Sequence, residues 1–195
     1  NCQKTTLRNF KKEMEQYISR YVVNGDFSGN ILVAKGDKVI FNKSYGKANF
    51  GLNIPIEEYH KFRIASVSKT FTAAAIVMLC NKGLVSYADK LSKYIPDFSM
   101  ADSISVLHLL LHQAGIPEIE YDRFALDKLS LNEIIQTIKD KPLLFKPGSR
   151  SSYSNSGYLL LAAIIEKASG LTYEKYLNEN IFKPIGMFDT GADFT

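Results

Sequence analysis

Cysteines, long apolar runs and clusters of like charge are scarce in this sequence of 195 residues. The two cysteines, Cys2 and Cys80, cannot form a disulfide framework, and no Cys/His cluster has the spacing of a zinc site. The longest apolar runs cover 73–80 and 158–165, whereas a membrane-spanning helix needs about 18 residues. These features exclude a disulfide-rich scaffold and give no indication of a zinc finger or of a spanning segment.

The charge balance is mildly basic. A total of 24 Lys and Arg against 20 Asp and Glu gives a net charge of +4, and the lysines are scattered without a basic stripe. This pattern does not indicate a nucleic-acid partner. Hydrophobic residues make up 46% and charged residues 23%, which is ordinary for a globular protein. A chain of this length buries about 70% of its unfolded surface, so we expect a core.

Hydrophobic periodicity predicts an α+β protein in which strands precede most of the helices. An amphipathic helix is expected over about 6–23, followed by strands at 30–34 and 38–41 with Gly36 and Asp37 in the turn. After Phe62 the chain is predicted to be mainly helical, near 67–82, 106–112, 131–138, 157–169 and 173–182. This order favours α+β over an alternating parallel sheet.

The predicted sheet has too few strands. Two or three strands are marginal by themselves, and no further strand is expected after Thr172. The backbone edge near 30–35 would then be unpaired, which predicts self-association through this edge.

Ser66 is the first candidate for chemistry, because it stands three residues before Lys69 at a predicted helix start. The two side chains share a helix face, so Lys69 can reach Ser66 Oγ. The helix N-terminus disfavours a charged ammonium and favours a nearby alkoxide, so the lysine could activate the serine as a nucleophile. The same spacing recurs at Ser44 and Lys47. The alternative is a capping serine followed by a solvated lysine.

Tyr153 is the second candidate, followed by Ser154 and Asn155. The three residues lie after a loop signal at 147–149 and before the helix predicted from Gly157. A phenol beside an amide can move a proton and hold a substrate carbonyl. The alternative is a helix-entry turn with Ser and Asn caps, and the Tyr-x-Asn spacing recurs at 176–178.

Both candidates lie in longer segments that resemble one family when taken together and in order. The segments are 62–72 around the serine, 109–117 at a helix end, 145–148 with 153–158 around the tyrosine, and 184–190. They resemble the serine β-lactamases and penicillin-binding proteins, in particular the class C β-lactamase and D-Ala-D-Ala carboxypeptidase branch, which includes esterases. The resemblance covers nearly the whole chain.

The resemblance implies a fold and a set of roles. The fold would be β-lactamase/transpeptidase-like, with an antiparallel sheet flanked by helices and a helical subdomain. Ser66 would be the acylated nucleophile, Lys69 would assist its deprotonation, Tyr153 would act as general base and donate to the leaving nitrogen, and Asn155 would orient Lys69 and the substrate amide. No metal or other cofactor is implied.

One family feature is absent from the sequence. A third motif, Lys or His, then Ser or Thr, then Gly, lies on a later strand in the family, and no such triplet follows Asn155. The segment 146–148 precedes Tyr153, and its proline would disrupt a central strand. The resemblance therefore implies a single incomplete domain over 1–195, with the first helix and strands in 6–60, a mainly helical subdomain in 61–195, and the C-terminal strands missing.

The missing strand would supply one backbone N–H to the oxyanion hole, the other coming from Ser66. Loss of one such donor typically costs about 10²–10³ in rate. We therefore expect a serine acyl-hydrolase of β-lactams or D-Ala-terminated peptides that is impaired in this chain. The alternatives are an esterase of the same family and a non-catalytic sensor or module that binds penicillin or peptidoglycan.

Cellular location and the histidines give weaker signals. The resemblance implies an exported bacterial protein, and Cys2 is either the remnant of a lipid-anchored N-terminus or a stray thiol. His108 and His112 have a spacing that can bind metal, but Leu109 follows His108 where a zinc-binding H-E-x-x-H motif has Glu. We expect His112 to close a helix and His108 to be partly exposed.

Overall fold

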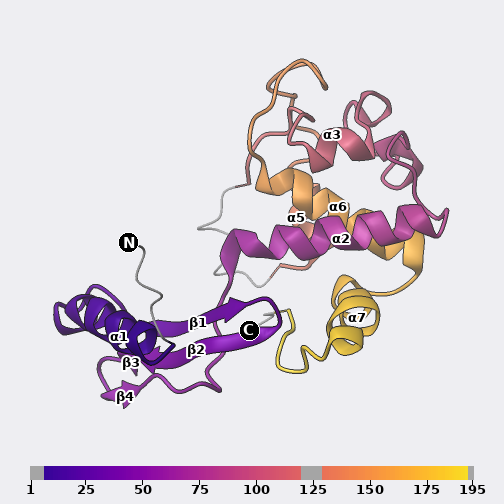
Figure 1. The fold of residues 1–195 in the computed structure, drawn as a ribbon. Coiled ribbons are helices and arrows are strands. Elements are labelled where there is room, and N and C mark those ends of the chain that lie inside the picture. Colours follow the sequence, from indigo (N-terminus) through magenta and orange to yellow (C-terminus); the bar gives the residue numbers. More distant parts are fainter. Residues whose placement is uncertain (1–6, 120–128, 193–195) are drawn as a thin grey trace, which may run out of the picture. The chain divides into compact units, whose positions relative to one another are not determined.

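The computed structural model describes residues 7–119 and 129–192 (Figure 1). Cys2, the predicted anchor point, lies outside these ranges. The chain divides into two compact units, Asn1–Phe62 and Arg63–Thr195. The first unit contains α1 (Leu7–Val23), β1 (Gly29–Lys35), β2 (Lys38–Tyr45), β3 (Lys47–Asn49) and β4 (Ile54–Pro55).

The predicted hairpin is confirmed. β1 pairs with β2 in antiparallel register from Gly29–Tyr45 to Lys35–Lys38, and the turn between them contains Gly36 with a φ of 59°. A left-handed backbone at this point favours glycine. The register shifts between Val33 and Ala34, as a β-bulge does. Within the described residues each sheet has two strands, β1–β2 and β3–β4.

The second unit is built mainly from helices and short helical turns. The helices are α2 (Ser68–Asn81), α3 (Val106–Leu110), α5 (Leu131–Gln136), α6 (Asn155–Ser169) and α7 (Tyr173–Leu177). The 3-10 turns are η1 (Ala65–Val67), η2 (Leu91–Lys93), η3 (Ala101–Ser103) and η5 (Lys183–Ile185), and η4 (Asn178–Phe182) is a π-helical turn.

The core of this unit lies where α2 and α6 pack side by side (Figure 1). Ile76 and Leu79 of α2 are fully buried, as are the apolar residues of α6 at 160, 161, 164 and 165. Burial of one such side chain stabilises the fold by about 1.5–3 kcal/mol. α2 and α6, which hold Lys69 and Asn155, are therefore anchored by the core of the unit.

Several helix boundaries differ from the expectation: α2 ends at Asn81 rather than 82, α5 at Gln136 rather than 138, and α7 at Leu177 rather than 182, where the π-helical turn η4 follows.

Three other differences lie close to the candidate residues. α2 begins at Ser68 rather than 67, because the residues before it form the 3-10 turn η1. α3 ends at Leu110 rather than 112, and His112 has a φ of 56°, which a right-handed helix cannot contain. α6 begins at Asn155 rather than 157, because Ser154 is its N-cap. Within the described ranges, no helix is long and apolar enough to cross a bilayer.

Candidate active site

Ser66 lies in η1, directly before the first residue of α2. Val67 N–H donates to the Ile64 carbonyl at 3.0 Å and closes the turn around the serine. Ala65, the preceding residue, has a φ of 44°. A left-handed conformation costs a residue with a Cβ roughly 1–2 kcal/mol. The serine is thus held in a strained turn just before the start of α2.

The four side chains singled out by sequence meet in one hydrogen-bonded group. Ser66 Oγ lies 2.7 Å from the Tyr153 hydroxyl. Lys69 Nζ donates to Ser66 Oγ at 3.5 Å and to Asn155 Oδ1 at 2.5 Å. The group joins the start of α2 to the start of α6, across 87 residues of sequence between Ser66 and Tyr153. We call Ser66, Lys69, Tyr153 and Asn155 the quartet.

Tyr153 has an altered acidity because of its neighbours. Hydrogen bonding with Lys69 and with Ser66, together with the positive charge of Lys69, lowers the pKa of Tyr153 below its usual value of 10.0. Lys69 Nζ also lies 4.8 Å from the centroid of the Tyr153 ring. A lower pKa increases the phenolate fraction near neutral pH. The phenol is therefore better suited than an ordinary tyrosine to accept the Ser66 proton.

The loop before Tyr153 is tied to the turn that follows α3. Backbone N–H groups of this loop donate to carbonyls of the turn: Leu144 to Gly115 at 2.7 Å, Gly148 to Gln113 at 2.9 Å and Ser152 to His112 at 2.8 Å. The Ser151 hydroxyl adds a bond to the Leu111 carbonyl at 3.0 Å. These bonds fix the loop that presents the phenol to Ser66.

The start of α6 is capped by side chains from both sides. Ser154 Oγ accepts from Gly157 N–H at 3.1 Å and donates to the Ile116 carbonyl at 3.4 Å. Glu118 Oε1 accepts from Asn155 N–H at 2.7 Å. A carboxylate is favourable at a helix N-terminus. The sequence suggested a serine cap here only as the alternative to a catalytic role for this motif, and it gave Glu118 no role.

The two histidines of α3 and its end have partners in the backbone. His108 Nδ1 accepts from Ser105 N–H at 3.3 Å, and His108 N–H donates to Ser105 Oγ at 3.1 Å, which forms a capping box. His112 Nδ1 accepts from Ser154 N–H at 3.1 Å. Within the described part of the chain, no group of three or more His, Cys, Asp or Glu could hold a metal ion.

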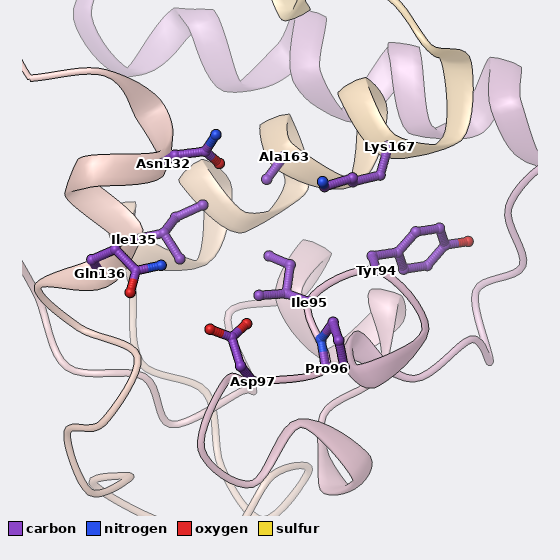
Figure 2. A pocket seen from close by; sticks show the side chains of 9 residues that line it. All are labelled: Tyr94, Ile95, Pro96, Asp97, Asn132, Ile135, Gln136, Ala163 and Lys167. Carbon is purple, nitrogen blue, oxygen red and sulfur yellow. The ribbon is translucent and has the colours of Figure 1, made fainter.

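A separate hollow lies elsewhere in the second unit. It has a volume of about 210 Å³ and is bounded by residues 94–97 and by side chains of α5 and α6 (Figure 2). No quartet residue lines it. The quartet instead lies at the surface, where Tyr153 is 52% exposed. Chemistry at Ser66 would therefore take place at the open ends of α2 and α6.

Comparison with known proteins gives matches over most of the chain. The family model described as Beta-lactamase matches residues 10–193. Penicillin-binding protein 4* of Bacillus subtilis (strain 168) is 34% identical over 189 residues, which are 94% of this chain and 42% of that protein. Among solved structures, a penicillin-binding protein from Bacillus halodurans is 31% identical with a TM-score of 0.81, over 91% of this chain and 56% of that chain.

A further solved structure carries a different activity in its name. The D-amino acid amidase from Ochrobactrum anthropi SV3 is 26% identical with a TM-score of 0.80, over 94% of this chain and 51% of that chain. This chain thus spans about two fifths of the curated relative and about half of each of these two structures.

Proposed function

Because this chain belongs to the beta-lactamase family, we propose that it carries the nucleophile and the general base of a serine acyl-hydrolase. The family match also confirms the predicted β-lactamase/transpeptidase-like fold. The chain spans 42% of the length of penicillin-binding protein 4*, so the activity of the whole protein is part of the proposal. The class C and carboxypeptidase branch stays a prediction.

The hydrogen bond between Ser66 Oγ and the Tyr153 hydroxyl is the observation that supports this proposal most. Tyr153 as phenolate accepts the Ser66 proton while Ser66 Oγ forms a bond to the substrate carbonyl carbon. The tyrosine then returns that proton to the leaving nitrogen or oxygen as the acyl bond breaks. Lys69 stabilises the phenolate, and Asn155 holds Lys69 in place. Water finally cleaves the acyl ester and restores the serine.

β-Lactams or D-Ala-terminated peptides are the proposed substrates. Two relatives are named as penicillin-binding proteins and another as a D-amino acid amidase, which supports attack on an amide carbonyl. A non-catalytic sensor that binds penicillin is the second candidate. A pure binder needs neither a general base nor a lysine beside the serine, so the intact quartet favours chemistry.

Slow turnover is proposed for the chain of 195 residues by itself. No Lys or His followed by Ser or Thr and Gly occurs after Asn155. In the serine β-lactamases and penicillin-binding proteins, that motif contacts the substrate and supplies one hydrogen-bond donor to the oxyanion hole. Loss of one such donor lowers the rate by about 10²–10³-fold. Nitrocefin hydrolysis at a rate typical of an efficient enzyme would contradict this part of the proposal.

Mass spectrometry after exposure to penicillin or a fluorophosphonate tests the proposed nucleophile. We expect one adduct on the peptide that contains Ser66 and none in the Ser66→Ala variant. Ser44→Ala is the matched control, because Ser44 has the same spacing to Lys47. Its hydroxyl is buried without a hydrogen-bond partner, so its loss should be mild. An adduct that persists in Ser66→Ala would refute the assignment.

The fate of the adduct distinguishes the candidate functions. A stable penicilloyl adduct favours a sensor or a carboxypeptidase, and rapid release of hydrolysed penicillin favours a β-lactamase. Turnover of simple esters alone favours an esterase.

Export to the bacterial envelope with a lipid anchor at Cys2 is proposed alongside. We expect the protein expressed from its native gene to incorporate a labelled fatty acid. The Cys2→Ala variant should carry no label. Absence of label in the unchanged protein would contradict the anchor.

A further inference from the structure

His112 contacts the proposed base from a different part of the chain. Its ring centroid lies 4.6 Å from that of Tyr153 and 5.0 Å from that of Tyr158. Its Nδ1 accepts a hydrogen bond from Ser154 N–H at 3.1 Å. The ring therefore lies against the phenol and at the same time binds the backbone of the next residue.

The backbone of His112 binds the other side of Tyr153. The His112 carbonyl accepts from Ser152 N–H at 2.8 Å. One residue thus holds the backbone both before and after Tyr153, and its ring packs on the side chain between them. His112 reaches this arrangement with a φ of 56°, a conformation that histidine, asparagine and glycine tolerate better than most residues.

We propose that His112 is a positioning residue: its neutral ring, with Nδ1 unprotonated, holds the Tyr153 phenol within reach of Ser66 Oγ, and protonation of the ring releases the phenol. This proposal rests on the proposed function in one respect, that Tyr153 acts as the base. It differs from the structural role expected from sequence, which was to end a helix. The ring acts through Tyr153 and does not contact the reacting atoms itself.

Protonation of His112 removes the acceptor on which the arrangement depends. An imidazolium carries N–H on both nitrogens, so Nδ1 would face the Ser154 N–H with a proton of its own. That hydrogen bond would be lost, and two donors would be brought together. Of the two bonds that His112 accepts from backbone N–H groups of this loop, only the one from Ser152 to the His112 carbonyl would then remain.

The charges around the ring favour its neutral form. Burial lowers the pKa of His112 below its ordinary 6.5, and the Lys69 ammonium lowers it further, while the Ser154 backbone and the Glu118 carboxylate oppose the shift. The other titratable groups against the ring are the phenols of Tyr153 and Tyr158. The hydrogen bond is therefore intact at neutral pH and is lost as the pH falls through the lowered pKa of His112.

Two substitutions of His112 test the hydrogen-bond acceptor at Nδ1 separately from the left-handed backbone conformation. His112→Asn keeps an acceptor close to the position of Nδ1, does not titrate and tolerates a positive φ. His112→Gly also tolerates this φ but has no acceptor. The pair therefore differs at the hydrogen bond to Ser154 without introducing backbone strain in either variant.

Carbon-13 NMR of tyrosine Cζ, with the Tyr153 signal assigned by Tyr153→Phe, gives a readout that requires no activity. We expect the unchanged protein and His112→Asn to show a Tyr153 pKa below 10, and His112→Gly to show a value shifted back towards 10. A Tyr153 pKa in His112→Gly equal to that of the unchanged protein would overturn the proposal.

The rate of Ser66 labelling by a fluorophosphonate supplies the second readout. Below the pKa of Tyr153 the logarithm of the rate should fall by one per pH unit, since the phenolate is the reactive form. In the unchanged protein the slope should steepen towards two once the pH falls through the lowered pKa of His112. His112→Asn should keep a slope of one.

His112→Gly should label about 10²-fold more slowly at neutral pH, the usual cost of misplacing a reacting group by about 1 Å. Equal slopes in the unchanged protein and in His112→Asn would refute the titration. Complete absence of labelling in the unchanged protein would refute the proposed hydrolase, and the tyrosine titration would still decide the role of His112.

Discussion

Gly115→Ala is expected to destabilise the second unit and to disturb the site. Gly115 has a φ of 74°, and a Cβ built on it would lie 2.3 Å from the Phe145 carbonyl oxygen and 3.3 Å from the Phe145 nitrogen and carbonyl carbon. Real Cβ atoms do not approach backbone atoms this closely, so the loop backbone at Phe145 must move. The same loop continues to Tyr153.

The magnitude follows from two separate costs. The left-handed backbone costs alanine about 1 kcal/mol net of the lost freedom of the unfolded glycine. Overpacking against a backbone that is itself hydrogen-bonded adds roughly 1–3 kcal/mol. Gly170→Ala is the matched control, because Gly170 has a φ of 71° with no atom within 4 Å of the added Cβ. We expect a loss of about 1 kcal/mol for the control and about 2–4 kcal/mol for Gly115→Ala.

Urea unfolding followed by far-ultraviolet circular dichroism measures both variants against the unchanged chain. Fluorophosphonate labelling of Ser66 is the companion assay, and it should slow in Gly115→Ala and not in Gly170→Ala. Equal losses of unfolding free energy in the two variants would show that the close approach of Gly115 to Phe145 carries no energetic weight. That result would refute the argument that this glycine sets the position of the loop.

Three further predictions follow from other contacts. Ser154→Ala removes the N-cap of α6 and should cost about 1 kcal/mol in urea unfolding, with Ser154→Thr retaining most of the stability. Burial would raise the pKa of Asp89, but hydrogen bonds from Lys93, Tyr94 and the Ser86 backbone lower it below 3.8. This contribution is present above pH 3.8 and is lost as pH falls through the lowered native pKa, so Asp89→Asn should flatten the acid side of a stability–pH curve; an unchanged acid side would contradict it. Self-association through β1 should appear as an increased mass in light scattering and should weaken in Leu32→Lys, whereas a monomer at all concentrations would count against it.

Local sequence signals predicted the elements that depend on local physics. The hairpin was predicted because Gly36 and Asp37 separate two β-rich runs. In the structure, Gly83 and Gly170 follow the ends of α2 and α6 with positive φ values, as glycines after helix ends do. The short pair β3–β4 was missed, because two or three residues per strand leave no hydrophobic alternation to detect.

The candidate site could be predicted only in part from local pattern. The spacing of Ser66 and Lys69 follows from one turn of helix. Tyr153 and Asn155 lie 86 or more residues further along, so their approach to Ser66 depends on the packing of α2 against α6, and only the family resemblance indicated it. The contact of His112 with Ser154 spans 42 residues and depends on a left-handed backbone at His112, which no periodicity reveals.

Ala65 has a consequence for how this sequence can change. A glycine there would adopt the same backbone without a Cβ penalty and would relieve roughly 1–2 kcal/mol of strain. It would also loosen the turn that aims Ser66 Oγ at its partner. Unfolding free energy and the placement of the Ser66 hydroxyl therefore make opposite demands on this backbone position.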